Sequence, residues 1–360
     1  MSKTNLSIDL MLTHNCNFRC HYCYEKDCSY EKKNIIPEVV EQTARYIDWW
    51  LGDDKDKTIR LSFWGGEPSL RVEEIKYFSE KYFNDERISF LTFTNGYLID
   101  SVLDVAKRFN GSERFFVQVS YDFAGQNRRV FAGGHPTKSL IKDSIKKVND
   151  SGCFFSIKST ISIEDLPRIY EYYQEFKELE KELGKELSLA ITPDTTCTWT
   201  KSEEDFEKML EDFRISLKKT LKLAVEKREK NFNWLSGGRQ LCTAGNGYIC
   251  IDLDGKIYPC HCAVFLKNKE EHLIGNITEF KEFKLDFDVF EEPSYCRECD
   301  ACLCFRCNAH CYDRSISNGG YSSRWLDFGS SYDFCRIMKE ISKISYAYKK
   351  ITTGNYFGRT

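Results

Sequence analysis

Three cysteines crowd into the segment HNCNFRCHYCYE at residues 14–25, with the spacing C-x3-C-x2-C. A cubane iron–sulfur cluster takes one thiolate per iron, so Cys16, Cys20 and Cys23 on one short loop could bind three of its corners. The fourth iron would stay open to an exogenous ligand. Structural zinc normally takes four ligands in two separated pairs, which this loop does not supply by itself. Cys28 is either a fourth ligand or a surface or packing cysteine.

The chain has 17 cysteines, an odd number that cannot all pair with one another. Four lie within residues 16–28 and eleven within residues 242–335, whereas Cys153 and Cys197 are isolated and are interpreted as small buried residues. The first residues lack a secretory signal, and no stretch approaches the ~20 apolar residues that span a bilayer. We therefore expect a cytoplasmic protein without a membrane segment. Because a reducing compartment disfavours disulfides, we expect the crowded cysteines to bind metal.

The charge balance argues against a nucleic-acid partner. Charged residues make up 30% of the chain and nearly cancel, which leaves a formal net charge of -3. Neither a basic footprint for polyanions nor a strongly acidic tail is present. At 360 residues the chain can bury one large core or two moderate ones, so we expect a compact globular protein.

Segments rich in β-branched and aromatic residues alternate with helical patterns over the first two thirds of the chain. Strands are predicted at residues 6–12, 58–64, 88–94, 115–121, 154–161 and 187–192, and helices at residues 37–51, 69–83, 100–109, 137–150, 165–182 and 203–231. Six consecutive βα units predict an α/β fold, and they suit a partial (β/α)6 TIM-like barrel better than a closed eight-stranded barrel. Chemistry in such folds sits at the carboxyl ends of the strands. The cysteine loop directly follows the first predicted strand.

The composition changes after residue 231. Asp254 and Gly255 lie between two alternating apolar runs, which predicts a β-hairpin. We place a domain boundary near residues 232–238. This gives a core domain at residues 1–235, a small cysteine-rich domain at residues 236–345 and a tail at residues 346–360.

The cysteine loop resembles the signature of the radical S-adenosylmethionine (SAM) family, CxxxCxΦC, in which an aromatic residue precedes the last cysteine. Tyr22 stands at that position. The resemblance implies a [4Fe-4S] cluster whose open iron chelates the amino and carboxylate groups of SAM. It also implies reductive cleavage of SAM to a 5′-deoxyadenosyl radical, which abstracts a hydrogen atom from the substrate.

Further motifs of that family follow the second and third predicted strands. Gly65, Gly66 and Glu67 form the GGE motif, in which glycines let backbone approach a ligand and the carboxylate can accept a hydrogen bond from the methionyl ammonium. Taken alone, such a segment would more often be a turn. Asn95 lies in a TNG sequence that relatives often carry at the end of strand three, so it is a candidate SAM-binding residue.

The end of the fourth predicted strand, VSYD, resembles a family stretch that lies near the SAM ribose or the substrate. It contributes Ser120 as a cofactor-binding candidate and Asp122 as a catalytic candidate. The segment FAGQNRRVF then replaces a slightly longer family segment, and Arg129 in it is a candidate ligand of the SAM carboxylate. The alternative for Arg129 is a solvated surface arginine.

The second group of cysteines resembles the SPASM extension, which usually binds two auxiliary [4Fe-4S] clusters. By this resemblance Cys242, Cys260 and Cys311 bind the first auxiliary cluster, and Cys299, Cys302, Cys307 and Cys335 bind the second. One interval is a residue shorter than in the family, so Cys296 and Cys304 compete as ligands. The remaining iron of the first cluster could take Cys250, Cys262 or substrate, although Cys250 also suits a packed thiol. Zinc is the alternative, but eleven thiolates would need nearly three zinc sites.

A radical SAM core with a SPASM extension resembles enzymes that modify peptides or proteins. We expect a thioether or carbon–carbon crosslink in a ribosomally synthesised peptide, with formylglycine formation on a sulfatase or peptide epimerisation as alternatives. In the anaerobic sulfatase maturases that the chain resembles, an aspartate directly after the second SPASM cysteine is the base. His261 stands at that position here, and it is either a proton acceptor or a structural histidine. A zinc- or cluster-bearing binding module is a distant non-enzymatic alternative. The expected partner is a reductant such as flavodoxin or ferredoxin. Since the first strand begins within ten residues, we expect substrate recognition by the barrel mouth, by the SPASM surface or by a separate leader-binding protein.

Overall fold

The computed structural model describes residues 4–23, 25, 33–194, 199, 201–227, 244–265, 269–283 and 328–353. The chain divides into two compact units. Unit 1 comprises Met1–Ser120, Arg129–Ser156 and Thr243–Glu291, and unit 2 comprises Tyr121–Arg128, Ile157–Cys242 and Glu292–Thr360.

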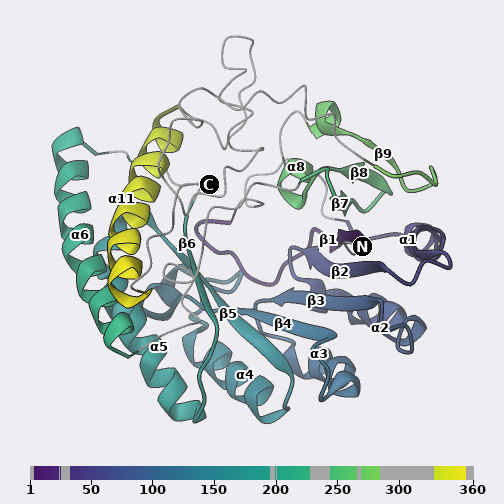
Figure 1. The fold of residues 1–360 in the computed structure, drawn as a ribbon, viewed down its shortest axis with the longest axis horizontal. Coiled ribbons are helices and arrows are strands. Elements are labelled where there is room, and N and C mark those ends of the chain that lie inside the picture. The colour runs from purple at the N-terminus through teal and green to yellow at the C-terminus, as the bar shows by residue number, and fades with distance from the viewer. Residues whose placement is uncertain are drawn as a thin grey trace. The chain divides into compact units, whose positions relative to one another are not determined.

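The strands of unit 1 lie in the order β4-β3-β2-β1-β7-β8-β9 (Figure 1). Their bounds are β1 (Thr4–Thr13), β2 (Lys57–Gly65), β3 (Ile88–Thr94), β4 (Phe115–Ser120), β7 (Tyr248–Ile251), β8 (Lys256–Tyr258) and β9 (Gly275–Asn276). Neighbouring strands from β4 to β7 run parallel, and β7, β8 and β9 pair antiparallel. Buried and half-buried residues alternate along β3 and β4, so one face of each strand packs in the core and the other carries the more accessible side chains.

The longer helices of unit 1 lie along one side of its strands, whereas the short helix after β8 lies beside β7 (Figure 1). Their bounds are α1 (Pro37–Leu51), α2 (Val72–Lys81), α3 (Ile99–Ala106), α4 (Lys138–Asp150) and the short α8 (His261–Val264). Proline opens α1, where its fixed φ and missing N–H are harmless. Val40, Ala44, Ile47 and Leu51 are buried at helical spacing, so α1 turns one apolar stripe inward.

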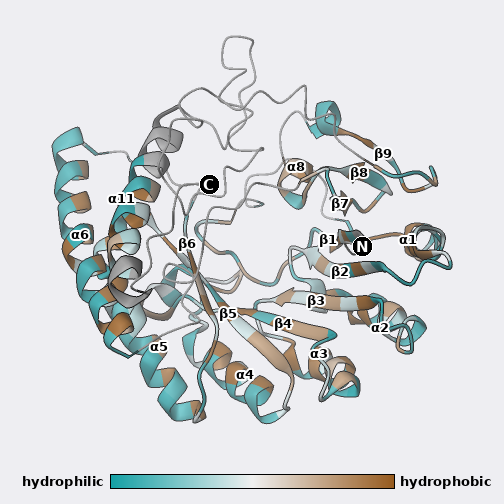
Figure 2. Ribbon diagram, in the orientation of Figure 1, coloured by the Kyte–Doolittle hydropathy of each residue, from teal (hydrophilic) through white to brown (hydrophobic). Residues whose placement is uncertain are grey.

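The described part of unit 2 contains a parallel strand pair and three long helices. They are β5 (Phe154–Ile161), whose first three residues belong to unit 1, β6 (Leu189–Pro193), α5 (Ile169–Leu183), α6 (Glu203–Glu226) and α11 (Phe328–Thr353). Ser202 caps α6 by accepting a hydrogen bond from the Asp205 N–H (3.1 Å). Arg214 of α6 donates to Glu340 of α11 at 2.9 Å. Figure 2 shows apolar and polar residues interleaved along α6, as expected for a helix with one buried side.

The predicted α/β fold with a parallel-stranded core is confirmed, and so is the hairpin, whose turn places Gly255 at φ +82°. Two predicted helices begin differently. The first starts as a 3₁₀ turn, Pro68–Arg71, before α2, and the second as a 3₁₀ turn, Ile163–Arg168, before α5. A proline lies in each of these turns, where its missing N–H does not interrupt an α-helical ladder. The predicted domain boundary near residues 232–238 lies outside the described residues. No helix in the described ranges is long and apolar enough to cross a membrane.

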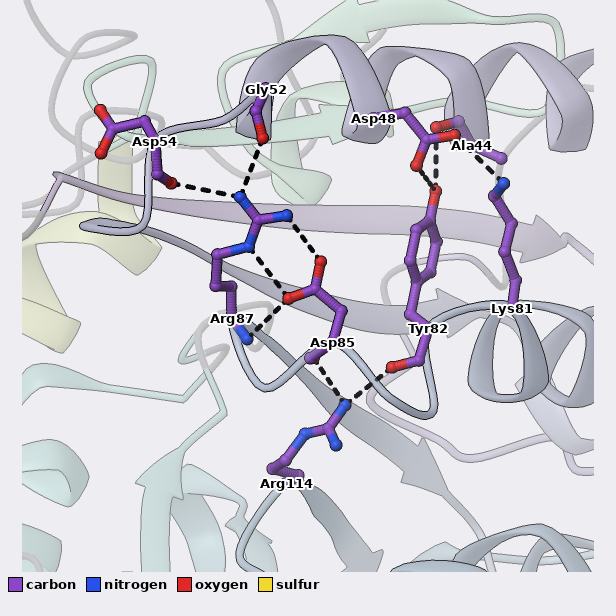
Figure 3. Close-up of polar contacts among 9 residues, drawn as sticks. All are labelled: Ala44, Asp48, Gly52, Asp54, Lys81, Tyr82, Asp85, Arg87 and Arg114. Atoms are coloured by element: carbon purple, nitrogen blue, oxygen red, sulfur yellow. Dashed lines mark hydrogen bonds and ion pairs between the residues drawn. The ribbon is translucent and has the colours of Figure 1, made fainter.

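A network of arginines closes the amino ends of β2, β3 and β4 (Figure 3). Arg87 donates to both carboxylate oxygens of Asp85 and to the carbonyls of Gly52 and Asp54. Arg114 donates to four backbone carbonyls within residues 82–88. The hydrogen bond from Arg87 holds the pKa of Asp85 below its usual value. These donors all meet acceptors of the protein itself, so this end of unit 1 is internally satisfied.

Candidate functional site

The cysteine loop leaves β1 at its carboxyl end and is anchored there. The Thr13 hydroxyl donates to Asn34 Oδ1 (2.6 Å) and accepts from the Asn15 N–H (3.0 Å). Farther along, the Cys23 N–H donates to the Cys20 carbonyl at 3.1 Å, which forms a turn between these two cysteines. The three predicted ligands therefore lie on one ordered loop of unit 1, all half-buried.

The two glycines of the GGE motif lie against this loop. The Gly66 N–H donates to the Thr13 carbonyl at 2.8 Å. A Cβ atom at Gly65 would lie 2.2 Å from the Thr13 oxygen, and one at Gly66 would lie 2.4 Å from the Asn15 oxygen. Glycine is thus required at the end of β2 because the backbone of the cysteine loop occupies the space of a side chain. The sequence predicted close backbone approach here, and the neighbour in this structure is the loop itself.

Glu67 joins the ends of β2 and β3. Its Oε1 accepts from the Ser69 N–H (3.1 Å) and the Thr94 hydroxyl (2.8 Å), and its Oε2 accepts from the Asn95 N–H (2.7 Å). The residue is only 1% exposed, and this burial raises its pKa although the three donors oppose the shift. Glu67 therefore fixes the turn that carries Asn95.

Asn95 reaches from that turn to the cysteine loop. Its side-chain Oδ1 accepts from the Tyr97 N–H at 3.0 Å. Its Nδ2 donates to Asn17 Oδ1 at 2.8 Å and contacts Cys16 Sγ at 3.9 Å. Asn17 Nδ2 is buried and has no hydrogen-bond partner among the described residues.

Arg129 lies on the other side of the loop. Its Nη1 lies 3.8 Å from Cys20 Sγ, and its guanidinium lies over the ring of Tyr22, 5.4 Å from the centroid. The residues after it are tied to the same loop, since Phe18 and Phe131 form a β-bridge with ring centroids 5.0 Å apart. Arg129 is 8% exposed, so it is a buried residue of this site and not a solvated surface arginine.

The thiols of the loop lie in a partly desolvated environment. Burial, followed by the nearby carboxylate of Glu67, raises the pKa of Cys16 to about 12. Burial, followed by Glu25, raises the pKa of Cys23 to about 12. Thiolates at these positions need positive charge nearby, which iron would supply.

The donor set of the loop fits an iron–sulfur cluster. Cys16 accepts from the Phe18 N–H at 3.4 Å in addition to the contact with Asn95, so N–H groups already face the sulfur atoms. Within the described ranges, no three His, Cys, Asp or Glu side chains form a site for a single metal ion. An iron–sulfur cluster does not require three side chains that converge on one ion, because each thiolate binds a different iron.

His261 lies in a second cluster of polar residues in unit 1, near the central strands. Its Nδ1 lies 2.8 Å from Asp9 Oδ2 and 2.8 Å from the Tyr248 hydroxyl, which also donates to Asp9. Its ring stacks on Trp64 with centroids 3.9 Å apart. Burial opposes the charged imidazole, but the hydrogen bond and charge of Asp9 together with Cys260 raise the pKa of His261. Asp9 fixes the ring through Nδ1, which leaves Nε2 as the nitrogen for another partner.

Only part of the predicted auxiliary ligand set falls in the described residues. Cys260 precedes α8 and is 7% exposed, Cys250 on β7 is fully buried, and Cys262 lies in α8. The hydrogen bond from Cys262, acting against burial, lowers the pKa of Cys260 to about 7. Cys335 lies in α11. The other auxiliary-cluster candidates lie outside the described residues: Cys242, Cys296, Cys299, Cys302, Cys304, Cys307 and Cys311. Cys28, the alternative fourth ligand of the first loop, lies outside them as well.

The remaining predicted residues, Ser120 and Asp122, lie at and just after the end of β4. Ser120 is its last residue and is half-buried in unit 1. Asp122 belongs to unit 2, is fully buried and accepts from the Thr160 N–H at 2.8 Å. Lys158 of β5 has its pKa lowered to about 8, chiefly by burial, although Asp122 opposes the shift.

Sequence reasoning missed Asp9, Trp64, Tyr248 and Lys158. Asp9 and Lys158 carried a signal, because each is a charged residue inside an apolar strand pattern, LSIDLML and FFSIKSTI. Trp64 and Tyr248 carried none, since an aromatic residue at a strand position is ordinarily part of the core. The grouping of Asp9 with His261 joins residues far apart in the chain.

Comparison with known proteins gives a family match to the first half of the chain. Residues 10–163 match the sequence model of the Radical SAM superfamily. A protein named as a glycyl-radical enzyme activating enzyme, from Methanocaldococcus jannaschii, is 26% identical over 164 residues, which is 45% of this chain and 57% of that protein. The radical SAM cyclopropyl synthase TigE from Paramaledivibacter caminithermalis is 24% identical over 171 residues, 43% of this chain and 35% of that protein. The matches thus span less than two thirds of either relative.

Solved structures with a similar fold cover more of the chain. Native anSMEcpe with bound AdoMet and Cp18Cys peptide matches with a TM-score of 0.68 and 18% identity, over 98% of this chain and 100% of that chain. SuiB from Streptococcus suis bound to S-adenosylmethionine matches with a TM-score of 0.54 and 15% identity, over 88% of this chain and 75% of that chain. At these identities the likeness shows a shared fold.

Proposed function

We propose that this chain, which contains a radical SAM domain and is thereby an enzyme of that superfamily, acts on a peptide or protein substrate. Cys16, Cys20 and Cys23 would bind a [4Fe-4S] cluster with one open iron for SAM. When bound, the cluster and SAM supply a one-electron reductive cleavage that yields a 5′-deoxyadenosyl radical. The observation that carries the proposal is the loop itself, with three thiols at the carboxyl end of a parallel strand and N–H groups facing its sulfurs.

We assign the residues around the loop to SAM. Gly65 and Gly66 hold the end of β2 against the loop, and Tyr22 lies under Arg129. The second oxygen of Glu67 accepts one hydrogen bond in the structure and has capacity for another, which suits the methionyl ammonium. Arg129 carries the positive charge that a SAM carboxylate requires. Asn95 and Ser120 line the same strand ends, and we place Asp122 at the ribose or substrate.

His261 is the proposed proton acceptor. Removal of a hydrogen atom and one electron from a substrate carbon also requires a proton to leave a neighbouring group, so an oriented base is useful. Asp9 and Tyr248 hold Nδ1, and Trp64 holds the plane of the ring. The imidazole could then accept a proton at Nε2.

The structural neighbours support a peptide as the substrate class. A structure of SuiB is described with its precursor peptide SuiA, and the anSMEcpe structure holds a peptide as well. We propose that the reaction installs a thioether or carbon–carbon crosslink in a ribosomally synthesised peptide. Formylglycine formation on a sulfatase is the second candidate, because the anSMEcpe fold matches nearly the whole chain.

The remaining parts of the proposal concern the second domain and the partners. Cys242, Cys260, Cys299, Cys302, Cys307, Cys311 and Cys335 would bind two auxiliary clusters of a SPASM domain at residues 236–345. These clusters could take up the electron left on the substrate. A flavodoxin or ferredoxin would reduce the first cluster in a reducing cytoplasm. The barrel mouth, the SPASM surface or a separate leader-binding protein would recognise the substrate peptide.

The test is anaerobic co-expression with a short peptide encoded beside the gene, followed by mass spectrometry. A crosslinking enzyme removes two hydrogens from one or two residues of the peptide, and the Cys20→Ala variant leaves the peptide unmodified. An unmodified peptide, with 5′-deoxyadenosine still formed, would reject the crosslink and direct the search to a sulfatase. Absence of 5′-deoxyadenosine from the wild-type enzyme would reject the SAM chemistry itself.

A further inference from the structure

Two asparagine amides, Asn17 and Asn95, lie directly beside Cys16. Asn95 Nδ2 donates to Asn17 Oδ1 at 2.8 Å and lies 3.9 Å from Cys16 Sγ, within the range of hydrogen bonds to sulfur. One residue belongs to the cysteine loop and the other to the end of β3. The contact therefore links the loop to the strand core through side-chain amides.

The orientation of the Asn95 amide is determined by its neighbours. The Tyr97 N–H can only donate, so the oxygen of the Asn95 amide must face it, at 3.0 Å. The nitrogen end must then face Cys16 and Asn17. The backbone N–H of Asn95 is held by Glu67 at 2.7 Å, and the residue is 6% exposed. Asn95 is therefore a fixed N–H donor and cannot turn away from the sulfur without breaking these bonds.

The amide of Asn17 is oriented in turn by Asn95. Because its oxygen accepts from Asn95 Nδ2, its own nitrogen points to the other side of the amide group. That nitrogen is buried and has no acceptor among the described residues. A buried amide N–H almost always has an acceptor in a folded protein. The sulfur atoms of a cluster on this loop are acceptors that the chain alone does not supply.

We propose that Asn17 and Asn95 form an amide pair that donates N–H hydrogen bonds to the sulfur atoms of the cluster and raises its reduction potential. The inference rests on the proposed function, since it requires the cluster at Cys16, Cys20 and Cys23. Reduction adds one negative charge to the cluster, and N–H donors to its sulfurs stabilise that charge. Loss of a donor therefore makes the cluster harder to reduce. Asn95 acts on the cluster even when SAM is absent.

The experiment is a redox titration of the reconstituted, full-length enzyme without SAM, followed by electron paramagnetic resonance. The relevant signal is the one that is absent when Cys16, Cys20 and Cys23 are all replaced by alanine. In Asn95→Ala we expect at least a threefold fall in the ratio of reduced to oxidised cluster at a fixed potential. This is a shift of roughly 28 mV to lower potential, since tenfold corresponds to 59 mV for a one-electron couple.

Asn17→Ala should lower the potential as well. The double variant should fall short of the sum of the single effects, because Asn95 orients Asn17. Asn34→Ala is the matched control: it removes an asparagine that braces the same loop through Thr13 and Asn15 but forms no hydrogen bond to a cysteine sulfur among the described residues. Its potential should equal that of the wild type.

The alternatives give distinct results. An unchanged potential in Asn95→Ala with weaker SAM binding would make Asn95 a SAM ligand only and overturn the proposal. An equal shift in Asn34→Ala would overturn it too, because disturbance of the loop would then suffice. If Asn95→Ala does not retain iron, the reduction potential of Asn17→Ala decides between these outcomes. That variant leaves Glu67 and the turn after β3 intact. A wild-type enzyme without the three-cysteine signal would instead reject the proposed function.

Discussion

The two ends of the strands of unit 1 use polar groups in different ways. At the amino ends, Arg87, Arg114 and Tyr82 donate to carboxylates and backbone carbonyls of the same chain (Figure 3). At the carboxyl ends, the donors of Asn95 and Arg129 lie next to thiol sulfurs instead. One end is satisfied by the protein itself, whereas the other offers donors and thiols to a bound group.

The two ends of the same strands therefore differ in role: the amino ends stabilise the fold, and the carboxyl ends carry the groups for chemistry. At the amino ends, hydrogen bonds connect the segments of α1, α2, β3 and β4. The donors and acceptors of these bonds all belong to the chain itself. The carboxyl ends keep a buried N–H at Asn17 and thiols whose ionisation is unfavourable without a cation. Substitutions at the first end should therefore lower the free energy of unfolding, and substitutions at the second should lower activity.

The largest effect is expected for Gly66→Ala. Its Cβ would lie 2.4 Å from the Asn15 carbonyl oxygen, so the cysteine loop must shift away from the end of β2. We expect loss of iron from the three-cysteine site and at least about a hundredfold fall in 5′-deoxyadenosine formation, because catalysis depends on ångström-scale placement. Iron content and product formation are the measurements.

The control is Gly133→Ala, whose added Cβ would meet, within the described part of the chain, only the ring of His135, at 3.4 Å. This variant should bind iron and cleave SAM like the wild type. Full activity in Gly66→Ala would mean that the tight approach of the two backbones is not needed for the cluster.

Arg114→Met should have the next largest effect, on stability alone. The change removes the guanidinium donor from four backbone carbonyls within residues 82–88, although those of Tyr82 and Asp85 keep a backbone N–H donor. Partial solvation of the guanidinium moderates the loss, so we expect about 2–3 kcal/mol in the free energy of unfolding. Urea unfolding measures it, and SAM cleavage per folded molecule should not change. A fall in that specific activity without loss of stability would contradict the separation of the two ends.

A smaller, pH-dependent effect is expected for His261→Gln. The pKa of His261 lies above its ordinary value of 6.5, chiefly through Asp9 acting against burial. The stabilisation from the charged imidazole is therefore fully present below pH 6.5 and is lost as the pH rises through the folded-state pKa. Urea unfolding at about pH 6, 7.5 and 9 should show the gap between wild type and variant narrowing with pH. A gap that stays constant or widens would exclude the charged pair.

Tyr82→Phe should have the smallest effect. Its hydroxyl has one proton to donate and two acceptors on α1, the Ala44 carbonyl and Asp48 Oδ1, both 2.9 Å away. Water can reach the half-exposed Asp48 in the variant, so we expect a loss of only about 1 kcal/mol. The midpoint of urea unfolding measures it. A loss above that of Arg114→Met would show that the tyrosine hydroxyl, and not the guanidinium, contributes more to the closure of the amino ends.

Local sequence patterns predict much of the fold but few of the hydrogen bonds between residues of the site. The strand that carries Phe90 and the helix that carries Ile47 follow from periodicity, which is a local property. The cysteine loop follows from spacing within eight residues. By contrast, Glu67 meets Asn95 only because β2 and β3 end side by side, and the partner of a buried carboxylate has no signature in either segment.

The same limit applies to His261. The sequence marks it as a candidate base, yet its partner Asp9 lies 252 positions away, and only the pairing of β1 with β7 brings the two regions together. The glycines of the GGE motif show a further case. Sequence indicates that backbone must approach something there, but whether that is a ligand or another loop depends on the three-dimensional path of the chain.

The most direct test of the central claim is anaerobic SAM cleavage by the reconstituted enzyme with a strong reductant, comparing wild type, Cys20→Ala and Cys153→Ala. Cys153 is a buried cysteine far from the loop in sequence and serves as the matched control. The account predicts 5′-deoxyadenosine from the wild type and from Cys153→Ala, and none from Cys20→Ala. Equal product from all three, or none from the wild type, would contradict a SAM-cleaving cluster at Cys16, Cys20 and Cys23.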